Sequence, residues 1–347
     1  MNLRHHGDSD TAPGLIDLAV NVRSPAPAWL LHALTHDPAR WAIYPDPREA
    51  MAALANRHGV PPHYVLPVAG AAAAFTLVAE SLRPTQPVVV HPQFTEPESA
   101  LTDAGLPVTR HVLPAPAFLL DPDKVPHGDL VVIGNPTNPT GTLHPAAAIR
   151  SLRRPDRIVV VDEAFMDFVP GEQESVLNGD DLTGMLVVRS LTKMWGIPGI
   201  RAGYVVGDPR LVEVLAHRQR PWATSTPALD ALVVCNTPEA LAEAGAAARQ
   251  TDNDRALLCS ALANVGFPVA GTPRTPFVLV PSTRLGRESI RPRLARHGFA
   301  VRRGETFPGL GPDWFRAAVR DEATSTALAE ALAAIAQAAG SHPSTSG

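Results

Sequence analysis

Near-continuous apolar runs alternate with segments of mixed polarity through the first two thirds of the chain. Runs rich in valine and isoleucine are typical of strands that are buried on both faces. The segments 47–59 and 146–154, which lie before and between such runs, are expected to be helices. The pattern therefore predicts a mainly parallel sheet with helices on both faces. The expected strands are 87–92, 129–136, 156–165, 184–191 and 202–208.

The pattern changes near residue 220. Residues 227–266 are rich in alanine and leucine and are expected to be helical, as are 287–298 and 324–340. Short apolar runs between them predict a second, smaller sheet from 267–271, 275–281, 299–305 and 313–320. This order of elements is typical of a smaller α+β domain.

We therefore expect four regions along the chain. An N-terminal arm over 1–36 precedes a large domain over 37–220, and a small C-terminal domain covers 221–340. The polar tail, 341–347, is expected to be disordered.

Composition excludes several classes of protein. The 347 residues are 45% apolar and 18% charged, with a net charge of −4 and no basic block, so neither nucleic-acid binding nor a polybasic membrane contact is expected. No apolar run approaches a membrane span, and the N-terminus lacks a signal-peptide core. Cys235 and Cys259 lack metal-ligand spacing, so no metal site is expected. A cytoplasmic enzyme is the default interpretation.

Polar residues follow the predicted strands of the large sheet. Ligands bind at the carboxyl ends of parallel strands, and here those ends carry His91, Asn138, Asp162 and the segment 190–193. A carboxylate that ends an apolar strand is partly buried and requires a positive partner. We therefore expect these side chains to form one site.

The residue types in this site favour a particular chemistry. Lys193, with Arg201 nearby, has the setting of a lysine whose pKa is lowered enough to form a Schiff base. The small-residue segment 68–75 opens a helix, where backbone N–H groups can bind a phosphate. Lysine, carboxylate, helix N-terminus and arginine together describe a pyridoxal-phosphate site. Taken singly, each of these residues also has a non-catalytic interpretation. Lys193 could be a solvated loop lysine, Asp162 a helix cap, and Arg201 part of a surface ion pair.

Four motifs in order carry a resemblance to a known family. They are NPTNPTG (135–141), VDEAFMDF (161–168), RSLTKMWGIPGIRAGY (189–204) and FRAAVR (315–320). With them the chain, from about residue 6 to 320, resembles the fold-type I pyridoxal-phosphate enzymes of aminotransferase class I/II. It is most similar to the histidinol-phosphate aminotransferase-like branch and, within that, to cobalamin-pathway threonine-phosphate decarboxylases. The resemblance implies a seven-stranded, mainly parallel sheet sandwiched by helices, with a smaller C-terminal domain.

The resemblance also implies roles for the cofactor-binding residues. Lys193 would form the Schiff base and move the proton, and Asp162 would pair with the pyridine nitrogen. Asn138 would hydrogen-bond the 3-oxygen of the ring, and Phe94 would stack on the ring face. Tyr44 would reach the phosphate of the neighbouring subunit's cofactor, which implies a homodimer. The implied ligands of the cofactor phosphate are Gly70, Ala71, Ala72, Ser190 and Arg201.

A small phosphorylated amino acid is the implied substrate. Arg316 would bind its carboxylate, and the other implied substrate residues are His6, Asn21, Arg23, Arg302 and Arg320. Four positions depart from the family pattern: Phe165 stands where the aminotransferases have tyrosine, Ala73 where an acidic residue is usual, Arg23 in place of an amide, and Ser225 in place of asparagine. Phe165 fits the decarboxylase subgroup.

The predicted function is decarboxylation of L-threonine O-3-phosphate to (R)-1-amino-2-propanol phosphate in cobalamin biosynthesis. Two other reactions stay open: transamination of histidinol phosphate or another amino acid, and decarboxylation of phosphoserine, which differs by one methyl group. A non-enzymatic binding or regulatory module would be expected to lack Lys193 or Asp162, and both are present.

Overall fold

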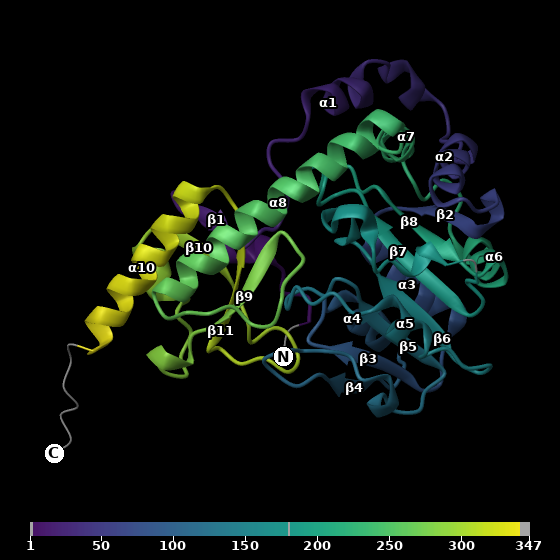
Figure 1. Ribbon diagram of the computed structural model, residues 1–347. Helices are drawn as coiled ribbons and strands as arrows, with labels where there is room; N and C mark the ends of the chain where they lie inside the picture. The colour runs from purple at the N-terminus through teal and green to yellow at the C-terminus, as the bar shows by residue number, and fades with distance from the viewer. Residues whose placement is uncertain (1–2, 180, 341–347) are drawn as a thin grey trace.

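The computed structural model describes residues 3–179 and 181–340, which form two lobes, each built on a sheet (Figure 1). Among these residues, seven strands form the large sheet in the order β2-β8-β7-β6-β5-β3-β4. Strands β3 to β7 run parallel, whereas β8 is antiparallel to both β7 and β2. The bounds are β2 (Val65–Val68), β3 (Pro87–His91), β4 (Thr109–Val112), β5 (Leu130–Gly134), β6 (Ile158–Asp162), β7 (Met185–Ser190) and β8 (Gly203–Gly207).

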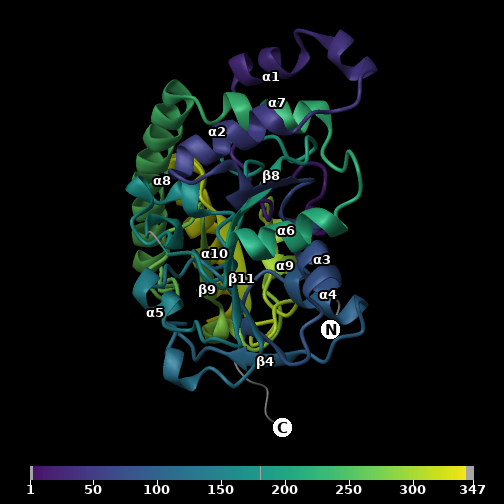
Figure 2. The ribbon, with the colours of Figure 1, turned by 90° about the vertical axis from the view of Figure 1, so that its right-hand side faces the viewer.

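Helices cover both faces of the large sheet because alternate residues of its strands point to opposite sides. Val160 of β6 and Leu186 of β7 pack toward α3 (Ala71–Leu82), while Val159 and Val161 pack toward α5 (Ala146–Arg150). Figure 2 shows α3, α4 (Glu96–Asp103) and α6 (Pro209–Arg218) on one side of this sheet and α5 on the other. The predicted fold class is confirmed, including the five strands read from apolar runs.

The small sheet has the strand order β1-β10-β11-β9. Its first strand comes from the predicted N-terminal arm, because β1 pairs in parallel with β10. The long helix α8 (Pro238–Asn264) runs from the large lobe to the small one, where it packs with α10 (Glu322–Gly340) (Figure 1). The strands are β1 (Ile16–Leu18), β9 (Phe277–Pro281), β10 (Phe299–Arg303) and β11 (Trp314–Ala318).

Helices α1 (Ala28–Thr35), α2 (Arg48–His58) and α7 (Thr226–Val234) lie together at one end of the large lobe (Figures 1 and 2). Helix α2 ends where predicted, at Gly59, whose φ of 63° closes the helix. Short 3₁₀ turns join the larger elements at Gly7–Asp10, Pro38–Ala42, Pro62–Tyr64, Pro122–Lys124, Met166–Phe168, Pro170–Glu172, Val176–Asn178 and Thr283–Leu285.

Several predicted elements differ in the structure, among them the helix 146–154, which ends at Arg150. The segment 267–271 is not a strand: Pro268 has no N–H to donate, and one bond, from the Ala270 N–H to the Leu279 carbonyl (2.8 Å), ties it to β9. The predicted helix 227–266 divides into α7 and α8, because Thr237 caps α8 through the Ala240 N–H. The predicted helix 287–298 is shorter, as α9 (Arg291–Arg296).

The predicted division at residues 36 and 220 stays a prediction, and the predicted disordered tail, 341–347, lies outside the described residues. Within 3–179 and 181–340, no helix is both long and apolar enough to cross a membrane.

Replacing Leu186 by alanine tests the packing of the central sheet. Leu186 is 0% exposed between β7 and the α3 layer, so Leu186→Ala should lower the free energy of unfolding by about 2–5 kcal/mol. The control is Leu257→Ala on α8, where the leucine is 42% exposed and a loss of under about 1 kcal/mol is expected. Urea denaturation followed by circular dichroism measures both, and equal losses would contradict this packing.

Candidate active site

A cavity of about 500 Å³ lies at the carboxyl-end edge of the large sheet, where that edge faces the small sheet and the N-terminal segment. Most of the residues predicted from the sequence to form a site line it. From the large lobe they are Ala71, Ala72, Phe94, Asn138, Asp162, Ser190, Lys193 and Arg201; from the small sheet Arg302 and Arg316; and from the N-terminal segment His6 and Asn21.

Asp162 is the last residue of β6, and its carboxyl group is buried at the cavity wall. Its Oδ1 accepts a hydrogen bond from the Ala164 N–H (3.0 Å), and none of the ion pairs among the described residues includes it. Burial raises the pKa of Asp162 to about 6. A buried carboxylate with so little compensation requires a positive partner in the cavity.

Lys193 follows β7 and lines the same cavity. Burial lowers the pKa of its amine to about 8, and the guanidinium groups of Arg316 and Arg201 add to the effect. A larger fraction of this amine is therefore neutral and nucleophilic at physiological pH than for an ordinary lysine.

The N-terminus of α3 and Arg201 form a cradle beside the lysine. Gly70, the residue before α3, has φ of 81°, and a Cβ there would lie 2.5 Å from Nη2 of Arg201. Only glycine fits this conformation and this close approach. The guanidinium of Arg201 donates to the Pro198 carbonyl (2.9 Å) and takes part in no ion pair among the described residues. The hydroxyl of Ser190 is hydrogen-bonded to that of Thr192 (2.8 Å) at the same edge.

Arg316 of β11 brings a second guanidinium into the cavity. Its Nη1 donates to Oδ1 of Asn138 (2.6 Å), its Nη2 donates to the carbonyl of Ala19, and its buried Nε has no hydrogen-bond partner in the described part of the chain. No carboxylate forms an ion pair with Arg316 within the described ranges. Asn21 adds another unused donor, because its buried Nδ2 also lacks a partner. Both side chains are therefore free to bind an anionic or polar ligand.

The ring of Phe94 lines the cavity and contacts His6, whose Nε2 lies 2.7 Å from Oε1 of Glu96. Phe165 lies at the cavity wall and packs edge-on against Phe277, with ring centroids 5.0 Å apart. Phe165 offers no hydroxyl to the cavity at the position where the resemblance implies a tyrosine in aminotransferases.

Arg302 lines the cavity but is already ion-paired. Its Nη1 lies 2.9 Å from Oδ2 of Asp10, a buried carboxylate that also contacts Arg291 and Arg303, each at 2.9 Å. The segment that carries His6 is thus fixed to β10. Asp10 escaped the sequence analysis because nothing near it in the chain indicates partners almost three hundred residues away.

Four predicted residues lie outside the cavity lining, and one of them, Gly70, directly precedes α3. Arg23 points to Glu243 of α8, with 3.4 Å between Nη2 and Oε1. Arg320 donates to backbone carbonyls, among them that of Val20 (2.7 Å). Tyr44 is 73% exposed and stacks on Trp222. The cavity lining also includes Asp8, Thr95, Glu96 and Phe307, which the sequence analysis did not select.

A comparison with protein families identifies relatives of the whole chain. The family model described as aminotransferase class I and II matches residues 13–334. The chain belongs to this family. The resemblance inferred from its motifs is confirmed.

Individual relatives of the chain carry two different names. A histidinol-phosphate aminotransferase of Mycobacterium tuberculosis is 44% identical over 324 residues, or 92% of this chain and 87% of the relative. A threonine-phosphate decarboxylase of Salmonella typhimurium is 29% identical over 294 residues, or 81% and 79%. The solved aspartate aminotransferase from Thermus thermophilus with maleate has a TM-score of 0.83 at 22% identity, covering 93% of this chain and 92% of that one, and so shares the fold.

Aminotransferases of class I and II depend on pyridoxal phosphate, and the cofactor predicted from the sequence is confirmed. The cavity fits this group. Asp162 forms no ion pair among the described residues, Lys193 offers the amine, and Gly70 leaves open the space beside Arg201 that a phosphate requires. The individual roles of these residues stay predictions.

The two lysines of the chain, Lys124 and Lys193, allow a direct test. The neutral amine is the reactive form, so the rate of cofactor attachment to Lys193 in the apoenzyme should rise with pH and level off above about 8. Lys124, which is exposed and lies outside the cavity, should be labelled far more slowly. Borohydride reduction at timed intervals and peptide mass spectrometry measure both.

Lys193→Arg is the matched variant, since it keeps the positive charge but removes the primary amine. It should yield no label at position 193 at any pH. Attachment at Lys124 alone in the wild-type protein would contradict the assignment of Lys193.

Proposed function

We propose that this pyridoxal-phosphate-dependent enzyme is an aminotransferase for a small phosphorylated amine such as histidinol phosphate. One observation carries the proposal: a single cavity holds the Lys193 amine together with two guanidinium groups, of Arg201 and Arg316, that have no carboxylate partner among the described residues. Two anionic groups are therefore expected, one on the cofactor and one on the substrate. The relative with 44% identity supports this reaction over the decarboxylation predicted from the sequence.

The cofactor ring, when bound, supplies an electron sink for the bond that breaks. Asp162 would accept the hydrogen bond of the ring nitrogen and keep it protonated. The Oδ1 of Asn138 accepts a hydrogen bond from Arg316, which leaves the amide N–H groups of Asn138 to donate to the ring oxygen. Lys193 Nζ would carry the proton to and from the substrate carbon.

The phosphate of the cofactor would bind at the start of α3. The backbone N–H groups of Ala71 and Ala72 are free for this at a helix N-terminus, and Ser190 and Arg201 lie beside them. Phe94 would cover one ring face. Arg316 would orient the substrate through its anionic group, a carboxylate or a phosphate, and Asn21 would add its unused donor.

Phe165 favours a second candidate, decarboxylation of L-threonine O-3-phosphate. Without a tyrosine hydroxyl, Asn138 is the one predicted donor to the ring oxygen, and this matches the decarboxylase subgroup named above. The two reactions differ in which substrate bond lies perpendicular to the ring, so positioning by Arg316 decides between them. Phosphoserine would be decarboxylated in the same way.

A product assay separates the two reactions. With histidinol phosphate and 2-oxoglutarate, we expect glutamate to form in proportion to amine consumed. With threonine phosphate and no keto acid, release of CO₂ over many turnovers would instead establish the decarboxylase. Arg316→Gln should lower kcat/KM about 100-fold in whichever reaction occurs, since a charged hydrogen-bond partner of the substrate is lost.

We propose in addition that the enzyme is a homodimer whose sites are shared, as is typical of the family. Exposed aromatic and aliphatic side chains gather beside α1 and α7: Trp41 (53% exposed), Ile43 (68%), Tyr44 (73%) and Trp222 (59%). Large apolar groups this exposed are typical of an interface. Tyr44 would then reach the cofactor phosphate of the partner subunit.

Mixing two inactive variants tests the shared sites. Lys193→Ala and Tyr44→Ala should each be nearly inactive alone. In a hybrid dimer one site regains both residues, so an equal mixture should recover about a quarter of wild-type activity by random exchange of subunits. Sedimentation should show dimers throughout. An active monomer, or a mixture without recovery, would contradict the proposal.

A further inference from the structure

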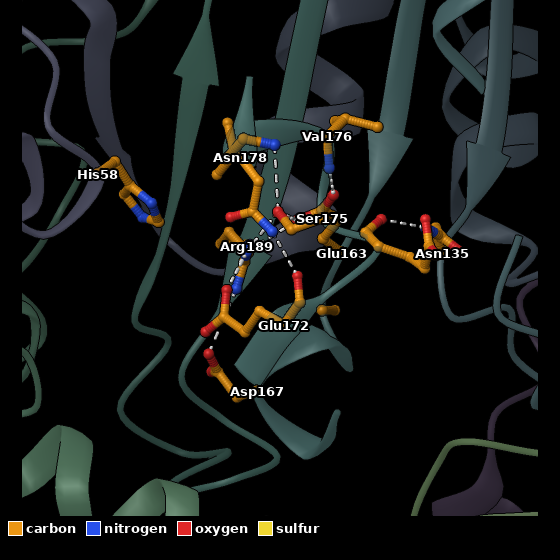
Figure 3. A network of polar contacts seen from close by, with 12 residues as sticks. His58, Asn135, Glu163, Asp167, Glu172, Ser175, Val176, Asn178 and Arg189 are labelled. Atoms are coloured by element: carbon orange, nitrogen blue, oxygen red, sulfur yellow. Dashed lines mark hydrogen bonds and ion pairs between the residues drawn. The ribbon is translucent and has the colours of Figure 1, made fainter. Parts of the chain in front are cut away.

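The ends of β6 and β7 carry charged residues that do not line the cavity. Glu163 directly follows Asp162, and Arg189 directly precedes Ser190. Because successive residues point to opposite sides of a strand, Asp162 and Ser190 face the cavity while the two neighbours face away from it. Glu163 and Arg189 are each 1% exposed, and Figure 3 shows them within one polar network.

The two side chains form an ion pair with 2.8 Å between Nη2 of Arg189 and Oε2 of Glu163. The carboxylate of Glu163 also accepts from the Ser175 hydroxyl (2.7 Å) and from the Val176 N–H (2.8 Å) (Figure 3). Its own N–H donates to the Val188 carbonyl of β7 (2.9 Å). Both carboxylate oxygens and the backbone N–H of Glu163 are thus engaged.

Arg189 extends the network to a loop outside the sheet. Its Nη2 donates to Oε2 of Glu172 (2.6 Å), and its Nη1 donates to Oδ1 of Asp167 (3.3 Å). Arg57 of α2 contacts the same two carboxylates, each at 2.7 Å. The network therefore joins both strand ends to the segment 165–178 and to α2.

Fold stability alone does not account for these buried charges. Moving ions out of water costs several kcal/mol each, and well-packed apolar residues commonly replace a buried ion pair without loss of stability. A pair in this place has a further effect, since it fixes the backbone on both sides of Asp162.

We propose that Glu163 and Arg189 are a positioning pair that holds Asp162 in place against the ring nitrogen of the cofactor. The proposal rests on the assignment of Asp162 made under the proposed function. Glu163 touches neither cofactor nor substrate and acts through its neighbour.

The charge of Glu163 also acts on Asp162 directly. Burial raises the pKa of Asp162 most, the Glu163 carboxylate raises it further, and Lys193 from the loop after β7 lowers it. The residues in register with Asp162 are Gly134 of β5 and Val188 of β7, which carry no charge. Removing the charge at position 163 should therefore lower the pKa of Asp162.

Cofactor binding to the apoenzyme between pH 5 and pH 8 tests the pair. Asp162 is ionised above its pKa, so the affinity of the wild-type apoenzyme for pyridoxal phosphate should fall as the pH drops through about 6. Glu163→Gln should bind the cofactor about tenfold more weakly at pH 7.5, as for the loss of one charged hydrogen bond. Its acid midpoint should move down by about half a pH unit.

Glu172→Gln is the matched control. Glu172 accepts a hydrogen bond from the same Nη2 of Arg189 that forms the ion pair with Glu163, and this change also removes one negative charge from the network. Among the described residues, no hydrogen bond or ion pair joins Glu172 to β6, so the acid midpoint and affinity should stay at wild-type values although the melting temperature falls. A purely structural role predicts that both variants behave alike, and identical pH profiles would overturn the proposal.

Two further variants complete the test. Glu163→Asp keeps the charge with a shorter side chain, so it should keep the acid midpoint but lose affinity; it also serves where Glu163→Gln does not fold. Asp162→Asn should abolish the pH step. If the fall in cofactor affinity near pH 6 persists in Asp162→Asn, the assignment of Asp162 is wrong. If Asp162→Asn abolishes this fall but Glu163→Gln leaves its midpoint unchanged, only the proposed role of Glu163 and Arg189 is wrong.

Discussion

The hydrogen-bond register of β5, β6 and β7 is the constraint on which the rest of the site depends. It sets Asp162 opposite Gly134 on one side and Val188 on the other. From this register the loop with Asn138 and the loop with Lys193 leave the sheet on either side of the carboxylate. A slip of one residue would turn Asp162 to the far side and bring Glu163 into the cavity. The apolar residues that alternate between the two helix layers oppose such a slip.

Much of the large lobe was predictable, for a physical reason. Strands buried on both faces have unbroken valine and isoleucine runs, so 158–162 and 185–190 could be recognised and their polar ends assigned to one edge. Strands without such runs were missed. Strand β4, with the sequence TRHV, lies at the sheet edge and is partly exposed. Strand β2 contains Pro67, and because proline is unusual inside a strand, the sequence pattern did not predict it.

Contacts between distant parts of the chain were not predictable. Asp10 fixes the N-terminal segment to Arg302, and Arg23 turns toward Glu243 rather than into the cavity. These two contacts depend on how distant segments pack against each other, and a local sequence pattern does not predict such packing. The reaction could not be predicted from the sequence either, because the motifs specify a cofactor site but not the orientation of a substrate within it.

The hydrogen bond between Arg316 and Asn138 joins the two lobes inside the site. One residue belongs to the small sheet and the other to a loop of the large sheet. If Arg316 binds the substrate anion and Asn138 the ring oxygen, as proposed, the two binding events are coupled through this bond, and each changes the affinity for the other by the same factor. A rotation of one lobe against the other would then change both affinities.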